Sequence, residues 1–460
     1  MSRGQERGVP DLFRRLAGVS LCTALALAGC GGSSAPANPP QPPAGPPTFT
    51  VGGTVSGLAT GTTLTLNDNA GDPLTVSANG GFTFATPVPL NGAYAVTIGA
   101  QPAGQTCTLS NGSGSGVTAN VASVGINCVI GPEFAYVVNI LGNSVSQYAI
   151  GANGALTPMA VPSVRTGEEP DSIAIDPSAR FAYVTNSIDG TVSQYTIGAD
   201  GALTAASSTS VSSPSIGGFI MSVTVEPSGR FVYVAQGTTI YQYAIGTNGA
   251  LMAVSSPTVT TGRYSEFIIT DRTGRFAYVP CQDNSVWQFT IGTNGVLTAM
   301  SSPSVPTGSL PESIALDPSG RFAYVPNRDS NSVSQYTIGA DGALTAMSAP
   351  TVPAGLGPQS ITIDPSGRFA YVANGTDDTV SQYTIGVDGA LTAISPTTIS
   401  TEDSPTTFAV DPSGRFAYTA TSPYGTVVQY TIGLDGALTT MSGPAVQAGP
   451  TPVSIVIFRR

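Results

Sequence analysis

The stretch "DPSGRFAYV" occupies residues 317–325, recurs at 364–372, and is followed by "DPSGRFAYT" at 411–419. In its first half Asp can accept hydrogen bonds from backbone amides, Pro sets φ near about −65°, and Gly can adopt the left-handed conformation. In its second half apolar side chains occupy both faces of an extended segment, as in a strand packed between two neighbours. The stretch therefore predicts a tight turn followed by a buried β-strand.

The tyrosine of this stretch marks a longer repeat, because its seven copies are 45 to 50 residues apart: Tyr136, Tyr183, Tyr233, Tyr278, Tyr324, Tyr371 and Tyr418. The unit that begins at residue 311 contains four strand-like segments, "ESIALD", "RFAYV", "SVSQYTI" and "ALTAMSAPTV". Repeats of this length with several short strands are typical of propeller blades. We therefore predict an all-β protein with a seven-bladed β-propeller over residues 131–460.

A second turn signal supports the same unit. All seven copies carry Asn-Gly or Asp-Gly between the third and fourth segments, a strong hairpin signal, with the glycines at Gly154, Gly201, Gly249, Gly295, Gly342, Gly389 and Gly436. One copy departs from the first turn, because Ala179 stands where most copies have Gly. We expect strain of about 1 kcal/mol there if the backbone is left-handed.

The two ends of the repeat array complement each other. The first unit begins directly with "EFAYV" at residue 133 and lacks a first segment, whereas the chain finishes with "PVSIVIF" at 452–458, which matches that segment. We predict that the C-terminal strand completes the first blade, because this pairing removes the exposed edges of the ring. A closed ring of this kind is expected to be a monomer.

Residues 1–29 read as a secretory signal, because four arginines precede an apolar run at 16–28 that is too short for a permanent membrane span. The end of the run, "LAGC", resembles the bacterial lipobox, which implies that Cys30 is lipidated. Gly31 after it implies an outer-membrane-anchored lipoprotein of the cell envelope, periplasmic or surface-exposed, with the membrane as a partner. The pair Arg14-Arg15 leaves general secretory or twin-arginine export open. Residues 30–47 are rich in Pro and Gly, which predicts an extended linker.

Residues 48–130 alternate apolar and polar side chains between Gly, Asn, Asp and Pro turns, which predicts a small β-sandwich. The pattern resembles the immunoglobulin-like modules of bacterial surface proteins. Cys107 and Cys128 fall in this segment, and in an oxidising compartment we expect them to form a disulfide. Closing a loop of about 20 residues would stabilise the module by roughly 3 kcal/mol. Cys281 has no partner and is expected to be buried in a strand.

Composition excludes several classes of function. All 16 basic residues are arginine, the chain contains no lysine or histidine, and its net charge is −11. This charge opposes binding to nucleic acid. The sequence also contains no glycine-rich phosphate loop, haem-attachment motif or zinc-ligand cluster, so no cofactor is required.

The phrase "RFAYVTN" at 180–186, with "RFAYVPN" at 321–327 and "RFAYVAN" at 368–374, resembles the YVTN repeats and the seven-bladed lactonase family that includes bacterial 6-phosphogluconolactonase. The resemblance covers about residues 132–460 and implies the propeller fold. Members of that family often carry Pro-His before the first strand. The corresponding pairs here lack histidine throughout: Pro170-Asp171, Pro311-Glu312, Pro358-Gln359, Pro405-Thr406 and Pro452-Val453.

Loops that enter the first strand and loops that join the second and third strands usually form one face of a propeller. Three arginines fall in these loops, Arg165, Arg263 and Arg328, against twelve carboxylates: Glu168, Glu169, Asp171, Asp189, Glu266, Asp283, Glu312, Asp329, Asp377, Asp378, Glu402 and Asp403. Such a face repels a phosphorylated substrate and suits a cation or a neutral ligand.

Four residues occupy equivalent positions at the predicted channel mouth: Asp171, Glu266, Glu312 and Gln359. They are the candidate ligand-binding residues. The three carboxylates among them are the candidate Ca²⁺ ligands and the candidate catalytic acid and base. The alternative is that they are solvated loop edges or accept backbone hydrogen bonds.

Other polar groups have structural interpretations. The turn arginines Arg180, Arg230, Arg275, Arg321, Arg368 and Arg415 are expected to pair with Asp or Glu of the same turn rather than bind an anion. Asn139, Asn186, Asn327 and Asn374 are expected to cap turns. Trp287, the only tryptophan, is expected to pack on a blade face rather than stack on a glycan.

These observations lead to two hypotheses from different classes. The first is a non-catalytic binding or scaffold module that recognises a protein, glycan or small molecule through its acidic rim, with Ca²⁺ as a candidate ligand. The alternative is a lactonase-like hydrolase that acts on a neutral lactone with carboxylates alone.

Overall fold

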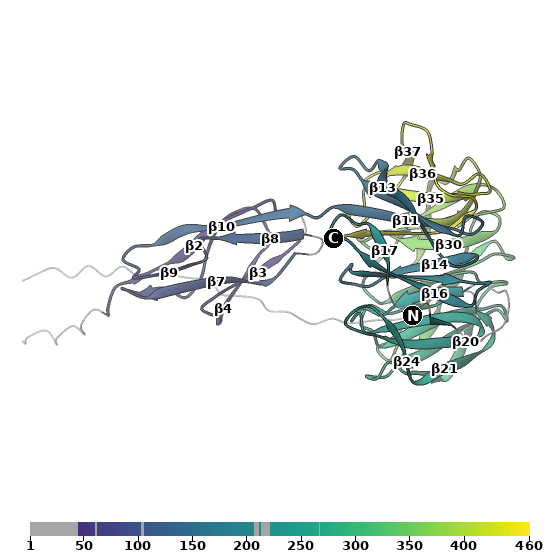
Figure 1. The fold of residues 1–460 in the computed structure, drawn as a ribbon, viewed down its shortest axis with the longest axis horizontal. Coiled ribbons are helices and arrows are strands. Elements are labelled where there is room, and N and C mark those ends of the chain that lie inside the picture. Colours follow the sequence, from purple (N-terminus) through teal and green to yellow (C-terminus); the bar gives the residue numbers. More distant parts are fainter. Residues whose placement is uncertain (1–44, 60–61, 103–104, 207–210, 213–220, 266) are drawn as a thin grey trace, which may run out of the picture. The chain divides into compact units, whose positions relative to one another are not determined.

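The computed structural model describes residues 45–59, 62–102, 105–206, 211–212, 221–265 and 267–460 (Figure 1). Within these ranges the chain is all-β, as predicted, with 39 strands. The same residues include no helix that is long and apolar enough to span a membrane. The predicted signal segment and the lipobox cysteine Cys30 lie outside the described residues.

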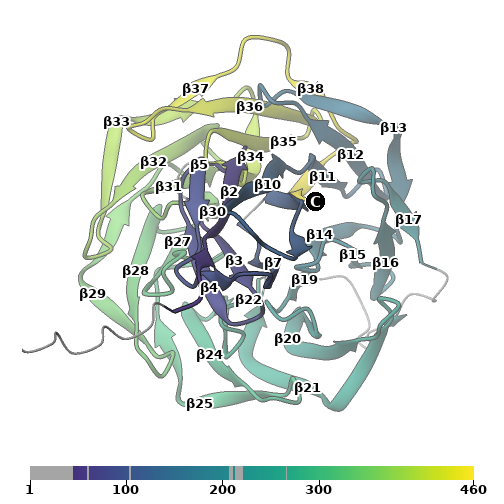
Figure 2. The same cartoon turned by 90° about the vertical axis from the view of Figure 1, so that its left-hand side faces the viewer.

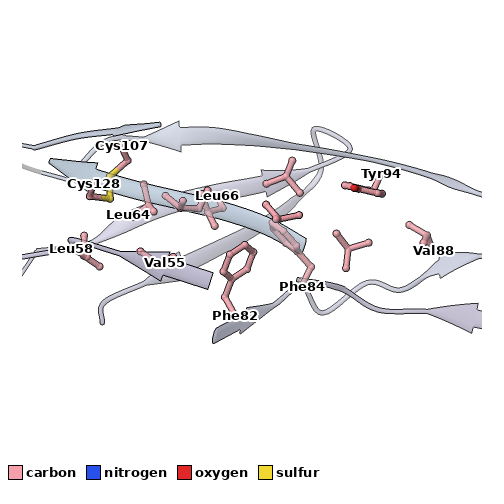
Figure 3. Close-up of a cluster of buried hydrophobic side chains, with 14 of the residues drawn as sticks. Val55, Leu58, Leu64, Leu66, Phe82, Phe84, Val88, Tyr94, Cys107 and Cys128 are labelled. Carbon is pink, nitrogen blue, oxygen red and sulfur yellow. A yellow bond between two sulfur atoms is a disulfide. The ribbon is translucent and has the colours of Figure 1, made fainter. Parts of the chain in front are cut away.

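The N-terminal module is a β-sandwich with two four-stranded sheets. One sheet has the order β5 (Gly80–Thr83), β2 (Val51–Ser56), β10 (Val121–Ile130), β8 (Gln105–Ser110), and the other β4 (Asp72–Val76), β3 (Leu64–Asp68), β7 (Ala93–Ala100), β9 (Ser113–Ser115). Strands β1 (Thr48–Phe49) and β6 (Val88–Pro89) form a further two-stranded sheet. Alternate side chains from the two larger sheets fill the core shown in Figure 3.

The predicted disulfide lies in this core. Cys107 on β8 and Cys128 on β10 are directly opposite each other in an antiparallel pair, and their sulfur atoms are bonded (Figure 3). The prediction from the sequence is therefore confirmed for this pair.

Residues from β11 onward form seven blades arranged in a ring (Figure 2). The innermost strands, in blade order, are β39 (Pro452–Arg459), β14 (Pro170–Ile175), β19 (Met221–Val225), β22 (Ile269–Thr270), β26 (Ala315–Leu316), β30 (Pro358–Ile363) and β34 (Ser404–Val410). The second strands are β11 (Glu133–Asn139), β15 (Phe181–Asn186), the first half of β20 (Phe231–Ile245), β23 (Phe276–Cys281), β27 (Phe322–Asn327), β31 (Phe369–Asn374) and β35 (Phe416–Ser422).

The third strands are β12 (Ser144–Ile150), β16 (Thr191–Ile197), the second half of β20, β24 (Ser285–Ile291), β28 (Ser332–Ile338), β32 (Thr379–Ile385) and β36 (Thr426–Ile432). The outermost are β13 (Leu156–Arg165), β17 (Leu203–Ala205) with β18 (Val211–Ser212), β21 (Leu251–Ser265), β25 (Leu297–Pro306), β29 (Leu344–Pro353), β33 (Leu391–Ser400) and β37 (Leu438–Thr440) with β38 (Val446–Gln447). Blades 3 and 4 are joined into one sheet where Ser265 of β21 pairs with Cys281 of β23.

The C-terminal strand closes the ring as predicted. Strand β39 pairs antiparallel with β11, with Phe458 opposite Phe134 and Arg459 opposite Glu133. The side chains of Arg459 and Glu133 form an ion pair. The first blade is thus built from both ends of the propeller sequence, and its inner edge is covered.

The repeated turn is held together by its aspartate, as the residues 317–325 show. Asp317 Oδ1 accepts hydrogen bonds from the amides of Arg321 and Phe322, both at 2.7 Å, and Oδ2 accepts one from the amide of Ser319 at 2.9 Å. Gly320 has φ = 72°, and Ala179, its counterpart in blade 2, has φ = 52°. The left-handed backbone at Ala179 is therefore confirmed.

The prediction that the turn arginines pair with the carboxylate of their own turn is wrong. Arg321 Nε instead donates to Ser319 Oγ at 3.1 Å, and the guanidinium lies 4.7 Å from the centroid of the Phe322 ring. All six turn arginines stack in this way, at 4.7 to 5.0 Å. The aspartate oxygens are occupied by amides and the serine hydroxyl, so the arginine finds its partner in the aromatic face.

A tyrosine joins each blade to the next. Tyr324 on β27 donates its hydroxyl to the carbonyl of Gly389, which lies in the hairpin between β32 and β33 of the following blade, at 2.6 Å. Gly389 has φ = 85°, and a Cβ there would lie 2.3 Å from the Phe322 ring. We call this contact the tyrosine clamp, and it occurs in all seven blades: Tyr136–Gly201, Tyr183–Gly249, Tyr233–Gly295, Tyr278–Gly342, Tyr324–Gly389, Tyr371–Gly436 and Tyr418–Gly154.

A glutamine of the third strand makes a second connection between blades. Gln335 Oε1 accepts a hydrogen bond from the amide of Leu391 in the next blade at 2.7 Å, while its Nε2 donates to Ala349 of its own blade at 2.9 Å. We call this contact the glutamine clamp. Its seven pairs are Gln147–Leu203, Gln194–Leu251, Gln242–Leu297, Gln288–Leu344, Gln335–Leu391, Gln382–Leu438 and Gln429–Leu156. The last pair joins blade 7 to blade 1.

Replacing Tyr324 by Phe should lower the free energy of unfolding by about 1–3 kcal/mol, because the buried carbonyl of Gly389 loses its donor. Tyr424, which is 77% exposed, provides the matched control. Denaturant unfolding of both variants measures the effect. Equal stabilities for Tyr324→Phe, Tyr424→Phe and the wild type would show that the tyrosine clamp contributes nothing.

Replacing Ala179 by Gly should raise the free energy of unfolding by about 1 kcal/mol, since Gly adopts φ = 52° without a steric penalty. The reciprocal change, Gly320→Ala, should lower it by a similar amount because Gly320 has φ = 72°. Thermal denaturation tests both. A melting temperature that is unchanged or lower in Ala179→Gly would contradict the strain at this turn.

Deleting residues 453–460 removes nearly all of β39 and exposes the inner edge of β11. The truncated protein should unfold or associate through this edge. Size-exclusion chromatography with light scattering and a thermal melt provide the test. A truncated monomer with the stability of the full chain would argue against closure by β39.

Candidate functional site

A cavity of about 240 Å³ lies where the seven innermost strands meet. Figure 2 shows β14, β19, β22, β30 and β34 gathered around the centre of the ring. Its lining comes from every blade: Ile140, Asp171, Ser172, Ser222, Phe267, Glu312, Ser313, Gln359, Ser360, Thr406, Thr407, Val453 and Ser454. We call it the axial cavity.

Two sequence positions per blade supply most of this lining. The residue after the proline of the entry segment forms a first ring: Asp171, Glu312, Gln359, Thr406 and Val453. The residue after that forms a second ring, which is almost entirely made of hydroxyl side chains: Ser172, Ser222, Phe267, Ser313, Ser360, Thr407 and Ser454. The first ring varies in charge and polarity, whereas the second offers hydroxyl donors and acceptors around the axis.

The predicted site residues Asp171, Glu312 and Gln359 are thus brought into one cavity. Asp171 belongs to blade 2 and Glu312 to blade 5, three blades apart in a ring of seven, so the two carboxylates approach the cavity from opposite sides. Glu266 lies outside the described residues. In the described part of the chain no three His, Cys, Asp or Glu side chains come together as a metal site, and Ca²⁺ binding by Asp171, Glu266 and Glu312 stays a prediction.

In blade 5 the residues that line the axial cavity precede an unusually short inner strand. Strand β26 has only 2 residues, whereas β14 and β30 have 6 each. Pro311 forms a single bridge to Asn327, and the amide of Glu312 donates to Pro326 O at 3.2 Å. The segment around Glu312 is therefore not held in a regular ladder, and its side chains can be placed by other contacts.

The carboxylate of Glu312 forms an ion pair with the guanidinium of Arg328. Arg328 Nη1 lies 3.1 Å from Glu312 Oε1, with side chains that are 46% and 13% exposed. The neighbouring Ser313 is 7% exposed, and its buried Oγ has no hydrogen-bond partner among the described residues. A buried hydroxyl without a partner is costly in a folded protein and is a group that a ligand can satisfy. The sequence reasoning missed Ser313, although serine after the entry pair in several units was a visible signal.

The acidic loops around the cavity also support the backbone. Asp189 accepts a hydrogen bond from the amide of Glu168 at 2.7 Å, and Asp377 accepts one from the amide of Leu356 at 2.9 Å. In each case the entry loop of a blade is joined to the loop between its second and third strands, so both sets of loops share one face, as expected. Part of the predicted acidic rim therefore accepts hydrogen bonds from backbone amides.

The remaining polar candidates are structural. Cys281 is fully buried, and burial raises the pKa of its thiol to about 12, so it remains protonated at neutral pH. Trp287 stacks on Phe289 with ring centroids 6.2 Å apart. Asn186 is buried and accepts a hydrogen bond from the amide of Gly167 at 3.0 Å, which confirms a capping role. Burial likewise raises the pKa of the clamp tyrosines above its ordinary value.

A comparison with protein-family models identifies the family of the propeller. The model described as "Lactonase, 7-bladed beta-propeller" matches residues 129–356 and 284–457, which together span more than half of the chain. The chain belongs to this family. The match begins at residue 129, so it does not include the β-sandwich, whose immunoglobulin-like character stays a prediction.

Solved structures support the same fold for this lactonase-family propeller. A Pseudomonas aeruginosa periplasmic gluconolactonase is 20% identical, with a TM-score of 0.61 over 71% of this chain and 98% of the other. A Bacteroides fragilis protein described as a candidate 6-phosphogluconolactonase is 18% identical, with a TM-score of 0.63 over 71% and 98% of the two chains. A Lactobacillus plantarum protein is 18% identical, with a TM-score of 0.62 over 72% and 100%. No curated protein matches the sequence significantly.

Proposed function

We propose that this lactonase-family propeller hydrolyses an uncharged lactone in its axial cavity. The observation that carries the proposal is on blade 5, where Glu312 and the unpartnered hydroxyl of Ser313 both line the cavity and Arg328 pairs with Glu312. Membership of the family favours this hypothesis over the non-catalytic scaffold. The P. aeruginosa neighbour, named as a gluconolactonase, is an example of the activity within the same fold.

Charge favours an uncharged lactone over a phosphorylated one. Asp171 and Glu312 both line the axial cavity, and none of the described residues of its wall is an arginine. Arg328, which contacts the cavity residue Glu312, is already paired with that carboxylate. A phosphate dianion would meet two carboxylates without a free guanidinium to bind it, whereas the hydroxyls of a neutral lactone can donate to the same carboxylates.

The geometry supports general-base hydrolysis. Glu312 accepts a proton from a water molecule as that water attacks the lactone carbonyl carbon, and Arg328 orients the carboxylate. The hydroxyl of Ser313 donates to the carbonyl oxygen as negative charge develops on it. When the ring C–O bond breaks, the proton returns from Glu312 to the departing ring oxygen, which leaves as a hydroxyl. The product is the open hydroxy acid.

Binding is assigned to the other polar groups of the cavity. Asp171, Gln359 and the hydroxyls of the second ring accept and donate hydrogen bonds to substituents of the lactone. A cavity of about 240 Å³ is smaller than the roughly 300–1,000 Å³ of drug-sized ligand sites, so it fits a single small ring. General-base hydrolysis needs no cofactor. A Ca²⁺ ion at Asp171, Glu266 and Glu312 would help to bind the lactone and would not take part in the proton transfer.

The site of action belongs to the same proposal. The lipobox at Cys30 and the signal segment before it support attachment to the cell envelope. The Cys107–Cys128 disulfide fits an oxidising compartment such as the periplasm. Closure of the ring by β39 covers the edge through which blades could associate, which supports a monomer.

Replacing Glu312 by Gln should lower kcat/KM for neutral lactones about a hundredfold or more, because the amide cannot accept the proton of the attacking water. Asp171→Asn should chiefly raise KM. Glu168→Gln is the matched control, since it makes the same charge change on an exposed residue of the same face that does not line the cavity. Turnover of δ-gluconolactone and of its phosphorylated form, followed by proton release, measures each effect.

Three results would contradict parts of this proposal. A purified wild-type protein that turns over no neutral lactone would leave the binding module as the function. Turnover that Glu312→Gln leaves unchanged would refute the catalytic role of blade 5. A preference for the phosphorylated lactone would refute the argument from charge.

A further inference from the structure

We propose that the substrate of the axial cavity carries an apolar tail, which leaves the cavity over an apolar strip on blades 1 and 7. This inference rests on the proposed lactone hydrolysis and adds the chemical class of the substrate. The strip is formed by Ile140, Leu141, Pro450 and Tyr424, and it continues from Val453 in the cavity wall.

The strip begins inside the cavity. Ile140 and Val453 both line the wall on blade 1, and the amide of Ile140 donates to Thr451 O at 3.0 Å. The loop that carries Ile140 therefore lies against the segment that enters β39. Leu141 follows directly and is 68% exposed, so the apolar surface extends from the wall of the cavity onto the open face.

Two glycines show that the loops of the strip lie side by side. A Cβ on Gly142 would lie 3.2 Å from Pro450 Cδ, and a Cβ on Gly425 would lie 3.6 Å from Pro450 Cα. Leu141 and Tyr424 directly precede these glycines, so each lies in a loop whose backbone passes beside the exposed Pro450. Tyr424 is 77% exposed. Single exposed apolar residues are ordinary, but three in neighbouring loops beside the half-buried Ile140 of a ligand cavity offer a surface for an apolar group.

The direction of the strip fits the orientation of the proposed substrate. The reacting groups Glu312 and Ser313 lie on blade 5, and blade 1 is three blades away in the ring of seven. A lactone with its carbonyl at blade 5 therefore directs a substituent on the opposite ring carbon toward Ile140 and Val453. The cavity of about 240 Å³ accommodates the ring, and the tail continues over the strip.

The test compares lactones that differ only in tail length. Wild-type kcat/KM should rise about fourfold for each methylene that becomes buried, from unsubstituted γ-butyrolactone through its methyl, ethyl and propyl derivatives. Leu141→Ser and Tyr424→Ser should flatten this dependence and leave the unsubstituted lactone within about twofold of wild type, because neither side chain lines the cavity.

Leu434→Ser is the matched control, since Leu434 is 95% exposed in a hairpin between the third and fourth strands, at the opposite end of its blade from the loops of the cavity face. It should keep the full dependence on tail length. Calorimetric binding of the corresponding alkyl tetrahydrofurans, which cannot be hydrolysed, measures the same dependence without turnover. Two results would overturn the inference. The first is that neither kcat/KM nor binding affinity of the wild type changes with tail length. The second is that Leu141→Ser and Tyr424→Ser keep the wild-type dependence on tail length.

The two proposals fail in different ways. Absent hydrolysis together with tail-dependent binding of the tetrahydrofurans would refute the lactonase function and keep the apolar strip. Hydrolysis of every lactone at one rate, whatever its tail, would keep the lactonase function and refute the strip.

Discussion

The propeller depends on a buried hydroxyl that crosses from each blade to the next. In the tyrosine clamp the second strand of one blade donates to the carbonyl of a left-handed glycine in the following blade, as Tyr324 does to Gly389. Neither partner can change independently, because the glycine has no room for a Cβ beside Phe322 and its carbonyl is buried. The clamp closes on itself through Tyr418 and Gly154, so the last blade is bound to the first by the same contact that joins all the others.

This arrangement separates structure from chemistry within each repeat. Backbone geometry is the role of the turn carboxylate in blades 2 to 7, and of the clamp tyrosine and the clamp glutamine in all seven blades, which explains why these residues recur. The first ring of the axial cavity makes none of these three repeated contacts and differs from blade to blade, with Asp171, Glu312, Gln359, Thr406 and Val453 at equivalent positions. Asymmetry at one position of a symmetric scaffold is sufficient to give one side of the cavity a carboxylate and another side an apolar wall.

Much of the fold was predictable because its signals are local or periodic. The spacing of the tyrosines, the Asp-Gly hairpins and the unmatched segment at 452–458 predicted seven blades and their closure, and each was confirmed. The clamps were not predicted, because a hydrogen bond between Tyr324 and Gly389 joins residues 65 positions apart. The prediction that the turn arginines pair with their own carboxylate failed for a related reason, since Asp317 already accepts hydrogen bonds from the amides of its own turn.

For the site, Asp171, Glu312 and Gln359 were found from the sequence because they occupy equivalent positions in their repeats. Ser313 and the strip of Leu141, Pro450 and Tyr424 were not, because they depend on burial and on contacts between loops.

The central claim is that the repeated residues build the ring, whereas residues of the axial cavity, Glu312 and Ser313 above all, perform the reaction. The most direct measurement is a substitution scan across the propeller in which every variant is assayed both for folded yield and for neutral-lactone turnover. The account predicts that variants at clamp positions lose turnover only in proportion to folded protein, whereas variants at Glu312, Ser313 and Asp171 lose turnover at full yield. It would be contradicted if the cavity variants lost folded yield as the clamp variants do, or if they kept wild-type turnover per folded molecule.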